Sequence, residues 1–465
     1  MRNFAHPDRV SQRKAALPQA EKYGTNGNIK QQSKLMKKLL LPALLLAVAT
    51  SADAQRNTLI PADGLHGSPE ALALSPAGKY VCGTTTAAAM FLYDTAAQTV
   101  IYKDGPTDES GDAIDSELRQ VNDNGLAAGY LGSTPVTMDK DGNLTELEQY
   151  TAEDGYETSA FAVSGDGKTV VGCAFLDYSY PIVWTDGKLS QLPVPTEEEA
   201  GYTVNGAVAK FVSGDGKTIV GYLEDDMAAM PLIIWKLQDD GATWAYDIVS
   251  KDYYEPGYGD LPYYCFSPED ISDNGRYIAV YLQRNYELDD DTESEGLGSF
   301  GVYDLQEGKL TVIAADGTNG IDTDAEISPC DIADDGTVVG YVGSLWSGDA
   351  KPFVKRASDE QPLLFTAAYE AETAFASYDW SLATNISADG KYITGYGQTS
   401  DGTYECFVLD VNAEPAGITG ATADASGSAA IVARYAVDGK RISALQRGVN
   451  IVKRANGRVE KVMVK

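Results

Sequence analysis

The chain has 465 residues, of which 36 are basic and 68 acidic, so its formal net charge is −32. A field of this sign repels nucleic acid and anionic lipid headgroups, which makes both poor partners. Cations, basic peptides and neutral glycans are compatible with it, and so is an acidic surface that only provides solubility. Because the sequence has two histidines and no Cys-x-x-Cys pair, a histidine-based zinc site and a Ser-His or Cys-His catalytic group are nearly excluded.

Residues 36–54 have the pattern of a secretory signal peptide. Two lysines precede a short apolar core, and a small-x-small cleavage site ends at Ala54, so we expect Gln55 to begin the mature chain. The apolar core is too short to span a bilayer comfortably, and a membrane anchor behind a cytoplasmic tail is the alternative. Residues 1–35 lie upstream of a good start at Met36, and we interpret them as a disordered extension of the gene.

A short phrase returns seven times between residues 71 and 395. In each copy a small apolar run leads to Ser, Asn or Ala, then to acidic or small residues, a glycine, and a second run that is mostly β-branched. The turn glycines are Gly78, Gly125, Gly167, Gly216, Gly275, Gly336 and Gly390, spaced 42 to 61 residues apart. Asp-Gly or Asn-Gly between two apolar runs predicts a tight β-hairpin, because the turn needs a positive φ.

A second hairpin follows the first in several repeats. Its clearest copy joins Pro181–Trp184 to Leu189–Leu192 through a turn at Thr185–Lys188. About four antiparallel strands per repeat, at a period of roughly 40–60 residues, predict the blade of a propeller. Residues 55–411 are therefore expected to form an all-β, seven-bladed β-propeller of four-stranded antiparallel blades. A β-sandwich or an open stack of hairpins is the alternative.

The seventh repeat is one strand short, because the chain after Cys406–Val411 enters a stretch rich in Gly, Ala and Ser. The segment Arg56–Pro61, ahead of the first repeat, could supply the missing strand. Pairing the two ends would close the ring and protect both exposed edges.

The repeat resembles the extracellular repeat family of Bacteroidetes, whose copies read VSxDGxxVVG followed by AFVW. Phe161–Gly172 with Pro181–Trp184 is the best match, and Phe211–Gly221 with Pro231–Trp235 is the next. The resemblance covers most of the chain. It implies a secreted β-propeller and very little about activity.

The C-terminal part of the chain differs from the repeats. Residues 412–428 have the composition of a flexible linker, and residues 429–465 alternate strand-like runs with turns, which predicts a small antiparallel β-unit. The runs around Tyr435–Ile442, Gly448–Lys453 and Gly457–Lys465 resemble the C-terminal sorting domain of Bacteroidetes type IX secretion cargo. This resemblance implies recognition by an outer-membrane secretion machinery, followed by release or attachment to the cell surface. An ordinary terminal β-unit is the alternative.

Charge and cysteines separate the two parts further. Residues 55–415 hold 18 basic and 62 acidic residues, whereas the tail from Ala416 holds nine basic and three acidic ones. The five cysteines all fall in the predicted propeller, and their odd number leaves at least one thiol without an intramolecular partner. We expect no disulfide framework in a domain of this size.

The predicted blades also separate two faces of the ring. In a four-stranded meander, the first and third turns lie on one face, which we name the tight-turn face. The middle turns and the crossovers between blades lie on the other, which we name the long-loop face. Since binding residues concentrate on loops held by a rigid scaffold, we predict function on the long-loop face.

Aromatic residues in the long loops are the first candidates for ligand binding. Tyrosine offers broad amphipathic contact at small entropic cost, which suits a glycan or a peptide, and tryptophan offers a stacking platform. The alternative is that these rings only anchor their own loops. The candidates are Tyr253, Tyr254, Tyr258, Tyr263, Tyr264, Trp346 and Trp380.

An acidic loop offers a candidate calcium site, because clustered carboxylates could hold Ca²⁺. Its residues are Asp289, Asp290, Asp291 and Glu293. No loop matches Asp-x-Asp-x-Asp-Gly with a downstream Glu, so a solvated acidic loop is the alternative. Apart from this calcium site, no cofactor is expected.

Together these patterns predict an exported, non-enzymatic propeller, secreted or attached to the outer-membrane surface, that binds a glycan or a protein ligand. The alternative is a secreted hydrolase or lyase that processes polysaccharide or peptide with Asp and Glu residues on the same face. Such enzymes need carboxylates at a defined separation. A cluster of Asp or Glu in the central channel with a facing Arg or Tyr would favour the enzyme. A channel lined by small and apolar residues would favour binding or a structural role.

Overall fold

The structure, a computed structural model, places a defined part of the chain. It describes residues 57–62, 64–150, 157–224, 230–249, 265–286, 295–345, 347–369, 375, 377–413, 431–436, 442, 448–454 and 459–464. The predicted signal peptide, with its cleavage site at Ala54 and Gln55, lies outside the described residues. Within them, none of the helices is long and apolar enough to cross a membrane.

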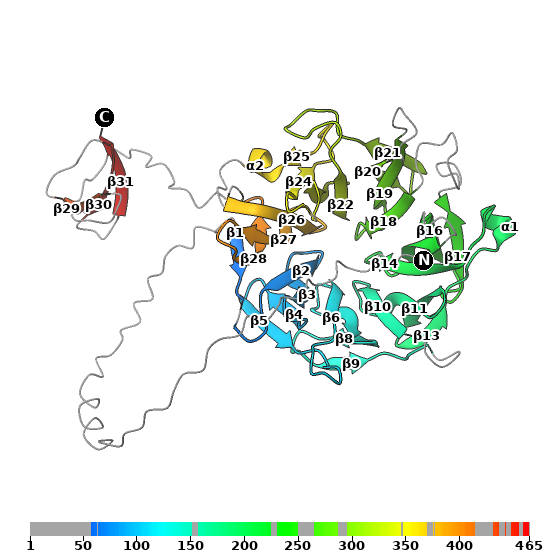
Figure 1. Ribbon diagram of the computed structural model, residues 1–465. Coiled ribbons are helices and arrows are strands. Elements are labelled where there is room, and N and C mark those ends of the chain that lie inside the picture. The colour runs from blue at the N-terminus through cyan, green and yellow to red at the C-terminus, as the bar shows by residue number, and fades with distance from the viewer. Residues whose placement is uncertain are drawn as a thin grey trace, which may run out of the picture. The chain divides into compact units, whose positions relative to one another are not determined.

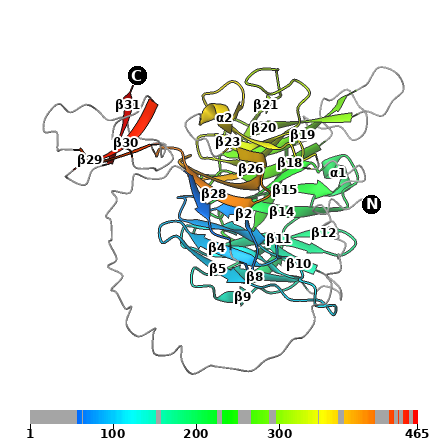
Figure 2. The ribbon, with the colours of Figure 1, turned by 60° about the vertical axis from the view of Figure 1, so that its left-hand side comes forward.

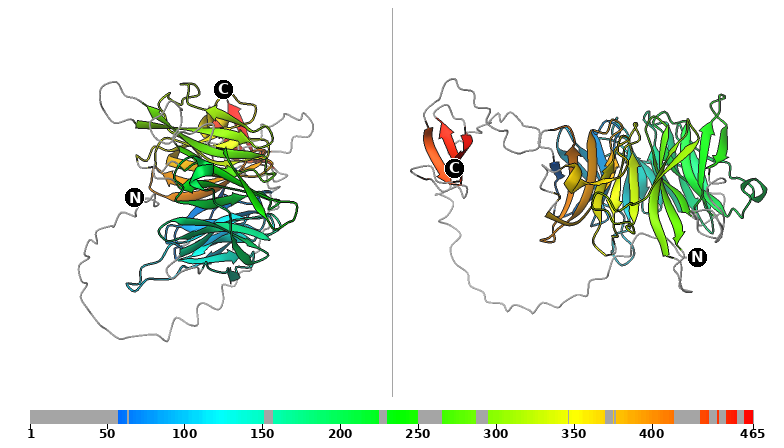
Figure 3. Two further views of the ribbon diagram at one scale, coloured as in Figure 1. Left: turned by 90° about the vertical axis from the view of Figure 1, so that its right-hand side faces the viewer. Right: turned by 90° about the horizontal axis from the view of Figure 1, so that it is seen from above.

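Seven four-stranded antiparallel sheets form a ring and follow one another in chain order (Figure 1). The predicted seven-bladed propeller is confirmed, and the stacked-hairpin and sandwich alternatives are wrong. Seen from the side, the strands of every blade run between the two faces of the ring (Figures 2 and 3). The first strand of each blade lies nearest the axis in Figure 1, and the fourth lies at the rim.

The first three blades run from β2 to β13. They consist of β2 (Pro69–Leu74), β3 (Tyr80–Thr85), β4 (Met90–Asp94), β5 (Thr99–Lys103); β6 (Ser116–Val121), β7 (Ala127–Leu131), β8 (Thr134–Met138), β9 (Leu144–Glu146); β10 (Glu157–Val163), β11 (Thr169–Phe175), β12 (Ser179–Thr185) and β13 (Lys188–Gln191).

The next three blades run from β14 to β25. They consist of β14 (Gly206–Val212), β15 (Thr218–Glu224), β16 (Leu232–Leu237), β17 (Trp244–Ile248); β18 (Cys265–Ile271), β19 (Tyr277–Tyr286), β20 (Glu295–Asp304), β21 (Lys309–Ile313); β22 (Ile327–Ile332), β23 (Val338–Val342), β24 (Lys351–Lys355) and β25 (Leu363–Leu364). Two short helices, α1 (Glu197–Ala200) and α2 (Phe365–Ala368), lie in the crossovers that lead out of blades 3 and 6.

The seventh blade joins the two ends of the propeller. Its strands β26 (Tyr378–Ile386), β27 (Tyr392–Thr399) and β28 (Tyr404–Asp410) are completed by β1 (Asn57–Ile60), which pairs antiparallel with β28 from Asn57↔Leu409 to Ile60↔Cys406. The predicted closure by the segment ahead of the first repeat is therefore confirmed. Ile60 is 3% exposed and belongs to a core cluster that also includes residues of blade 1.

Three further strands form a separate antiparallel sheet near the C-terminus. They are β29 (Ile431–Ala436), β30 (Gly448–Arg454) and β31 (Val459–Val464), in the order β29-β30-β31. This agrees with the predicted small antiparallel unit.

The repeated phrase forms the turn between the first two strands of each blade. In blade 3, the Ser164 hydroxyl donates to Asp166 Oδ1 over 2.9 Å and accepts from the Thr169 N–H over 3.1 Å. Asp166 Oδ1 also accepts from the Lys168 N–H, and Gly167 has a φ of +76°, a region that favours glycine. In this blade the Ser and the Asp of the phrase thus satisfy backbone N–H groups of the turn, and the glycine adopts the positive φ that the turn needs.

Hydrogen bonds join each of these turns to the turn of the next blade, around the whole ring. Starting at blade 1 and passing each blade in turn until blade 1 is reached again, the donor and acceptor atoms are Ala77 N and Asp123 Oδ1, Asn124 Nδ2 and Gly165 O, Gly165 N and Gly214 O, Gly214 N and Asp273 O, Asn274 N and Asp334 Oδ1, Asp334 N and Ala388 O, and Ala388 N and Pro76 O. The tight-turn end of the channel is therefore surrounded by a closed chain of hydrogen bonds.

A glycine in the second strand allows the first strand to bulge. In blade 4 a Cβ built on Gly221 would lie 1.8 Å from Val208 O, so no other residue fits this close approach of two backbones. Five more blades share this contact, at Gly83, Gly129, Gly172, Gly340 and Gly395. In blade 5 the position is Val280, and its partner on β20 is Gly301.

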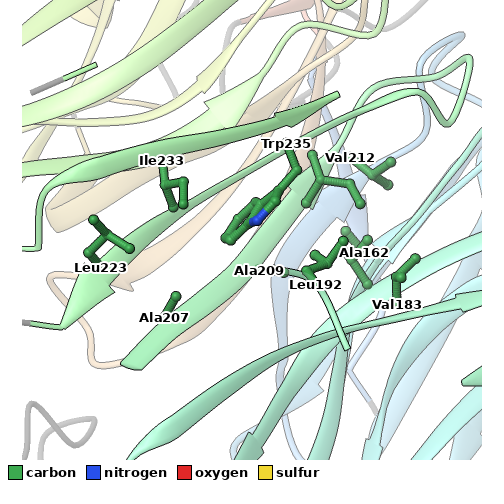
Figure 4. Close-up of a cluster of buried hydrophobic side chains, with 11 residues drawn as sticks. Ala162, Val183, Leu192, Ala207, Ala209, Val212, Leu223, Ile233 and Trp235 are labelled. Carbon is green, nitrogen blue, oxygen red and sulfur yellow. The ribbon is translucent and has the colours of Figure 1, made fainter. Parts of the chain in front are cut away.

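Apolar side chains fill the space between neighbouring blades. Figure 4 shows one such cluster, in which Trp235 and Ala207 of blade 4 belong with Ala162 and Val183 of blade 3. The Trp235 indole is fully buried, and its N–H donates to Pro193 O over 2.7 Å. The rigid body of the ring therefore leaves the channel and the two faces as the places where chemistry can occur.

Candidate functional site

The two faces of the ring differ in character. Of the eight exposed large hydrophobic residues among those described, five lie in crossovers or middle turns on the long-loop face, and a sixth, Tyr404, begins β28 next to a middle turn. These six are Leu65, Ile114, Leu176, Tyr178, Leu345 and Tyr404. The long-loop face therefore exposes more large apolar side chains than the tight-turn face does among the described residues.

Most of the residues predicted as ligand-binding cannot be placed. Tyr253, Tyr254, Tyr258, Tyr263, Tyr264 and Trp346 lie outside the described residues, as do the predicted calcium ligands Asp289, Asp290, Asp291 and Glu293.

Trp380 is described, and it is half-buried on β26. Its ring makes edge contacts with Tyr396 and Tyr404, with centroids 6.2 and 5.8 Å away. It also lines a cavity of about 240 Å³ on the long-loop face, together with Phe365 and Tyr378. The ring is thus anchored by neighbours and also borders open space, so both predicted roles are compatible with its position.

The central channel holds a second group of candidate residues. Each first strand carries a register shift that leaves one residue without a partner on the second strand. Each of these seven residues is half-buried and follows a buried residue. We name them the channel ring; they are Leu72, Arg119, Phe161, Lys210, Glu269, Cys330 and Thr384.

Sequence analysis missed the channel ring, although a signal was present. Each ring residue stands three positions ahead of the Ser, Asn or Ala that opens the turn. The type at this position changes completely from one repeat to the next, while its neighbours stay mostly small or apolar. A β-bulge explains the pattern, because it places an extra residue outside the regular alternation of the strand.

Arg119 is held from three sides. Its Nη2 lies 2.8 Å from Glu117 Oε2 and 3.5 Å from the Tyr130 hydroxyl. Its guanidinium carbon lies 5.4 Å from the centroid of the Phe161 ring and 5.6 Å from that of Tyr130. Its Nε is buried and has no hydrogen-bond partner among the described residues. The guanidinium is therefore fixed in orientation while some of its donors stay unused.

Lys210 and Glu269, both members of the channel ring, form a charged pair with each other. Lys210 Nζ lies 3.1 Å from Glu269 Oε2, donates to Pro268 O over 3.0 Å, and stands 5.1 Å from the centroid of the Phe211 ring. Both side chains are 27% exposed. The channel ring thus brings together both signs of charge and an aromatic ring.

The titration of neighbouring groups limits what the channel can do chemically. Burial raises the pKa of Tyr130 to about 12, against a smaller lowering by Arg119. Burial also raises the pKa of Tyr341 to about 12 and that of the Cys330 thiol well above its ordinary value. These groups are therefore protonated at neutral pH, and neither a thiolate nor a phenolate base is supplied by them.

Two aspartates of adjacent blades meet at the narrow end of the channel. Asp331 accepts from the N–H groups of Ile332 and Ile386, over 2.5 and 2.7 Å. Asp270 is hydrogen-bonded to Asp331, and burial beside that carboxylate raises the pKa of Asp270. Both line a small cavity of about 50 Å³. The pair ties blade 5 to blade 6 and, through Ile386, to blade 7.

The tight-turn face carries an acidic depression of about 530 Å³. Its acidic residues are Asp123, Asp273, Asp334, Asp335 and Asp389. Partial burial and the neighbouring carboxylates raise the pKa of Asp273. Among the described residues no group of three or more His, Cys, Asp or Glu side chains is arranged to hold a metal ion.

Comparison with known proteins assigns neither a family nor an activity to this chain. No family model matches the sequence, and no curated protein matches it. Similar solved structures include a putative TolB from Agrobacterium tumefaciens, at 17% identity and a TM-score of 0.33, covering 52% of this chain and 79% of that chain.

Two further similar structures are oligogalacturonate lyases. The one from Vibrio parahaemolyticus has 10% identity and a TM-score of 0.48, covering 76% of this chain and 93% of that chain. Another, in complex with manganese, has 11% identity and a TM-score of 0.46, covering 74% and 89%. At these identities and scores the likeness says nothing about the site or the reaction of this chain.

Proposed function

We propose that this chain is an exported β-propeller that binds an extracellular glycan or protein ligand on its long-loop face and does not transform it. The observation that supports this most is that six of the eight exposed large hydrophobic residues among those described lie at that end of the blades, opposite the acidic depression of the tight-turn face. A rigid ring with such loops is suited to recognition.

Export and surface location belong to the same proposal. They rest on the signal-peptide pattern of residues 36–54 and on the basic C-terminal unit that resembles a type IX sorting domain. In this proposal the C-terminal unit is the partner of the secretion machinery, and the propeller is the part that meets the ligand.

Binding is favoured over catalysis by the state of the channel groups. Burial keeps the Cys330 thiol and the Tyr130 and Tyr341 hydroxyls protonated at neutral pH. A general base or nucleophile has to be poised near the working pH. These three groups therefore do not supply an activated nucleophile.

A hydrolase or lyase is the second candidate, and one observation favours it. Glu117 lies beside Arg119, which also contacts Tyr130, so one carboxylate of the arrangement expected of such an enzyme stands with an Arg and a Tyr. In the present arrangement Arg119 pairs with Glu117, which leaves this carboxylate engaged.

A binding screen tests the proposal. The chain from Gln55 is purified and screened against extracellular glycans and proteins, with and without Ca²⁺, and each ligand that binds is checked for turnover. We expect a bound ligand that is recovered unchanged. Turnover of a polysaccharide or peptide would establish the second candidate instead, and a calcium requirement would support the acidic-loop site.

Matched variants locate the binding surface. Replacing Leu176 and Tyr178 by Ser on the long-loop face should weaken binding, since these side chains are 45% and 50% exposed there. Val312→Ser is the control, because Val312 is 38% exposed on the outer strand β21. Equal effects of both changes would contradict a ligand site on the long-loop face.

A further inference from the structure

We infer that the cavity beside Trp380, between blades 6 and 7, is a sugar pocket that takes one neutral pyranose unit of the ligand. This inference rests on the proposed binding function and names both the anchoring site and the class of glycan. It is carried by the cavity itself, by a second bulge in β26, and by hydrogen-bonding groups at the cavity that the fold leaves unused. The rest of the glycan then extends across the long-loop face.

The cavity exists because the outer strand of blade 6 is short. β25 has two residues, which pair with Phe353 and Val354 of β24, so the pairing does not reach Lys351 and Pro352 at the start of that strand. The chain continues directly into α2, which lies beside β24 (Figure 1). A space of about 240 Å³ is left between α2, the start of β24 and the start of β26.

Aromatic rings form one wall of this cavity, and they are held by fixed partners. Phe365 and Phe375 are 1% and 5% exposed and contact each other edge to face, with centroids 5.1 Å apart. The Tyr378 ring lies 6.3 Å from that of Phe375, and its hydroxyl donates to Glu405 Oε2 over 2.7 Å. Because the wall is formed in advance, a ligand that binds there orders few side chains, which favours affinity.

The indole N–H of Trp380 distinguishes this tryptophan from those that fill the core. Trp184 and Trp235 are fully buried. Their N–H groups donate to the carbonyl oxygens of Glu148 and Pro193, over 2.8 and 2.7 Å. Trp380 is half-buried, and within the described part of the chain its N–H donates to no other residue and is not sealed from solvent. One side chain of the cavity therefore offers both an apolar ring and a free donor.

A second bulge in β26 brings a carboxylate to the cavity. β26 shifts register twice against β27, whereas the first strand of every other blade shifts once. The extra shift leaves Asp379 without a partner on β27, and bulges of this kind re-aim side chains next to functional sites. Asp379 is exposed and lines the cavity, as does the exposed Lys351. Neither side chain makes a hydrogen bond to another described residue.

These groups together match a neutral sugar. A pyranose has an apolar face of ring carbons, which an indole can cover, and hydroxyls that both donate and accept hydrogen bonds. Asp379 can accept from such hydroxyls, while Lys351 and the Trp380 N–H can donate to them. The two charged side chains of the lining have opposite signs, and the excess of 62 acidic over 18 basic residues in 55–415 opposes an anionic sugar. An apolar peptide side chain would leave the polar groups unused.

The size of the cavity limits what enters it. Its volume of about 240 Å³ is below the range of about 300–1,000 Å³ that is common for sites of drug-sized ligands, so it suits a single ring. Beside it, Tyr404 is 37% exposed, with its ring 5.8 Å from that of Trp380. We therefore expect the terminal unit of a glycan inside the cavity and the following units outside it, beside Tyr404.

Ligand-observed NMR titrations of the chain from Gln55 test the inference. The neutral probes are the methyl glycosides of glucose, galactose, mannose and N-acetylglucosamine. N-acetylphenylalanine amide represents an aromatic peptide side chain, and the methyl glycoside of glucuronic acid represents an acidic sugar. We expect at least one neutral glycoside to bind, and to bind more tightly than the peptide probe and the acidic probe.

Matched variants show whether binding occurs at this cavity. Trp380→Phe removes the free donor and should lower the affinity for the bound glycoside by about fivefold. Asp379→Asn should lower it by about threefold, and because Asp379 is exposed this variant tests the site even if Trp380→Phe loses stability. Trp244→Phe is the control, since Trp244 is a half-buried tryptophan on the outer strand β17 of blade 4. It should leave the affinity unchanged, and urea unfolding shows which variants keep the fold.

Several results would overturn the inference. They are no binding of any neutral glycoside, tighter binding of the peptide or acidic probe, an unchanged affinity in Asp379→Asn and in a folded Trp380→Phe, or an equal loss in Trp244→Phe. Binding of a larger glycan or of a protein that depends on Leu176 and Tyr178, and not on Trp380, would leave the proposed function standing while this inference fails.

Discussion

The closure of the ring can be tested at a single side chain, Ile60. This residue is the last of β1, is 3% exposed, and belongs to the core cluster that includes Cys406 and Val408 of blade 7 and Phe91 of blade 1. Ile60→Ala removes three buried carbon atoms, which corresponds to about 2.4 kcal/mol of lost transfer free energy. The cavity left behind adds to this, so we expect the free energy of unfolding to fall by about 2–5 kcal/mol.

The neighbouring Leu59 provides the control within the same strand. Leu59 is 45% exposed and pairs with Phe407 through its backbone. Leu59→Ala should change the free energy of unfolding by no more than about 0.5 kcal/mol. Urea unfolding followed by tryptophan fluorescence measures both variants. Equal effects of the two substitutions, or a loss below about 0.5 kcal/mol for Ile60→Ala, would refute the packing of β1 between blade 7 and blade 1.

Three other predictions concern the interior of the ring. Gly221→Ala should lower the free energy of unfolding by about 3 kcal/mol, because the new Cβ would meet Val208 O. Gly64→Ala is the control in urea unfolding and should leave this free energy unchanged, since no atom lies within 4 Å of a Cβ at that position. Burial beside Asp331 raises the pKa of Asp270 above its value in the unfolded chain. The stability that protonated Asp270 contributes is therefore complete below about pH 4, and it is lost as the pH rises through the pKa that Asp270 has in the folded protein. Urea unfolding from pH 4 to 8 should therefore show a loss of stability for the wild type that is smaller for Asp270→Asn. The Cys330 thiol, whose pKa burial raises, should resist alkylation in the folded protein at pH 8 and react in urea, as mass spectrometry would show.

The repeats carried enough information to predict the blades and their closure. Asp-Gly and Asn-Gly turns between apolar runs specify hairpins locally. The number of copies of this turn, of which the one at Ser164 is an example, sets the number of blades. The segment ahead of the first repeat matched the one strand that the last repeat lacks, which β1 and β28 confirm.

The channel ring could not be predicted in the same way. Its position depends on a bulge, and a bulge shifts the alternation of a strand by one residue without any signal in hydrophobicity alone. Asp270 and Asp331 come from blades 5 and 6, and their contact exists only because the ring brings those blades together.

The loops chosen as candidates from sequence remain predictions. Trp380 is the one predicted ligand-binding residue that the structure describes, and it lines a cavity on the long-loop face. A Tyr-rich or acidic loop shows its composition in the sequence, whereas its conformation depends on contacts that no short pattern encodes.

Hydrogen–deuterium exchange of the chain from Gln55, with and without the ligand found in the screen, tests the central claim most directly. Binding on the long-loop face over the channel predicts slower exchange in the crossovers and in first strands such as Ser116–Val121 and Gly206–Val212, with the tight turns unchanged. Protection confined to the tight turns around Asp273 and Asp334, or to the outer strands, would contradict it.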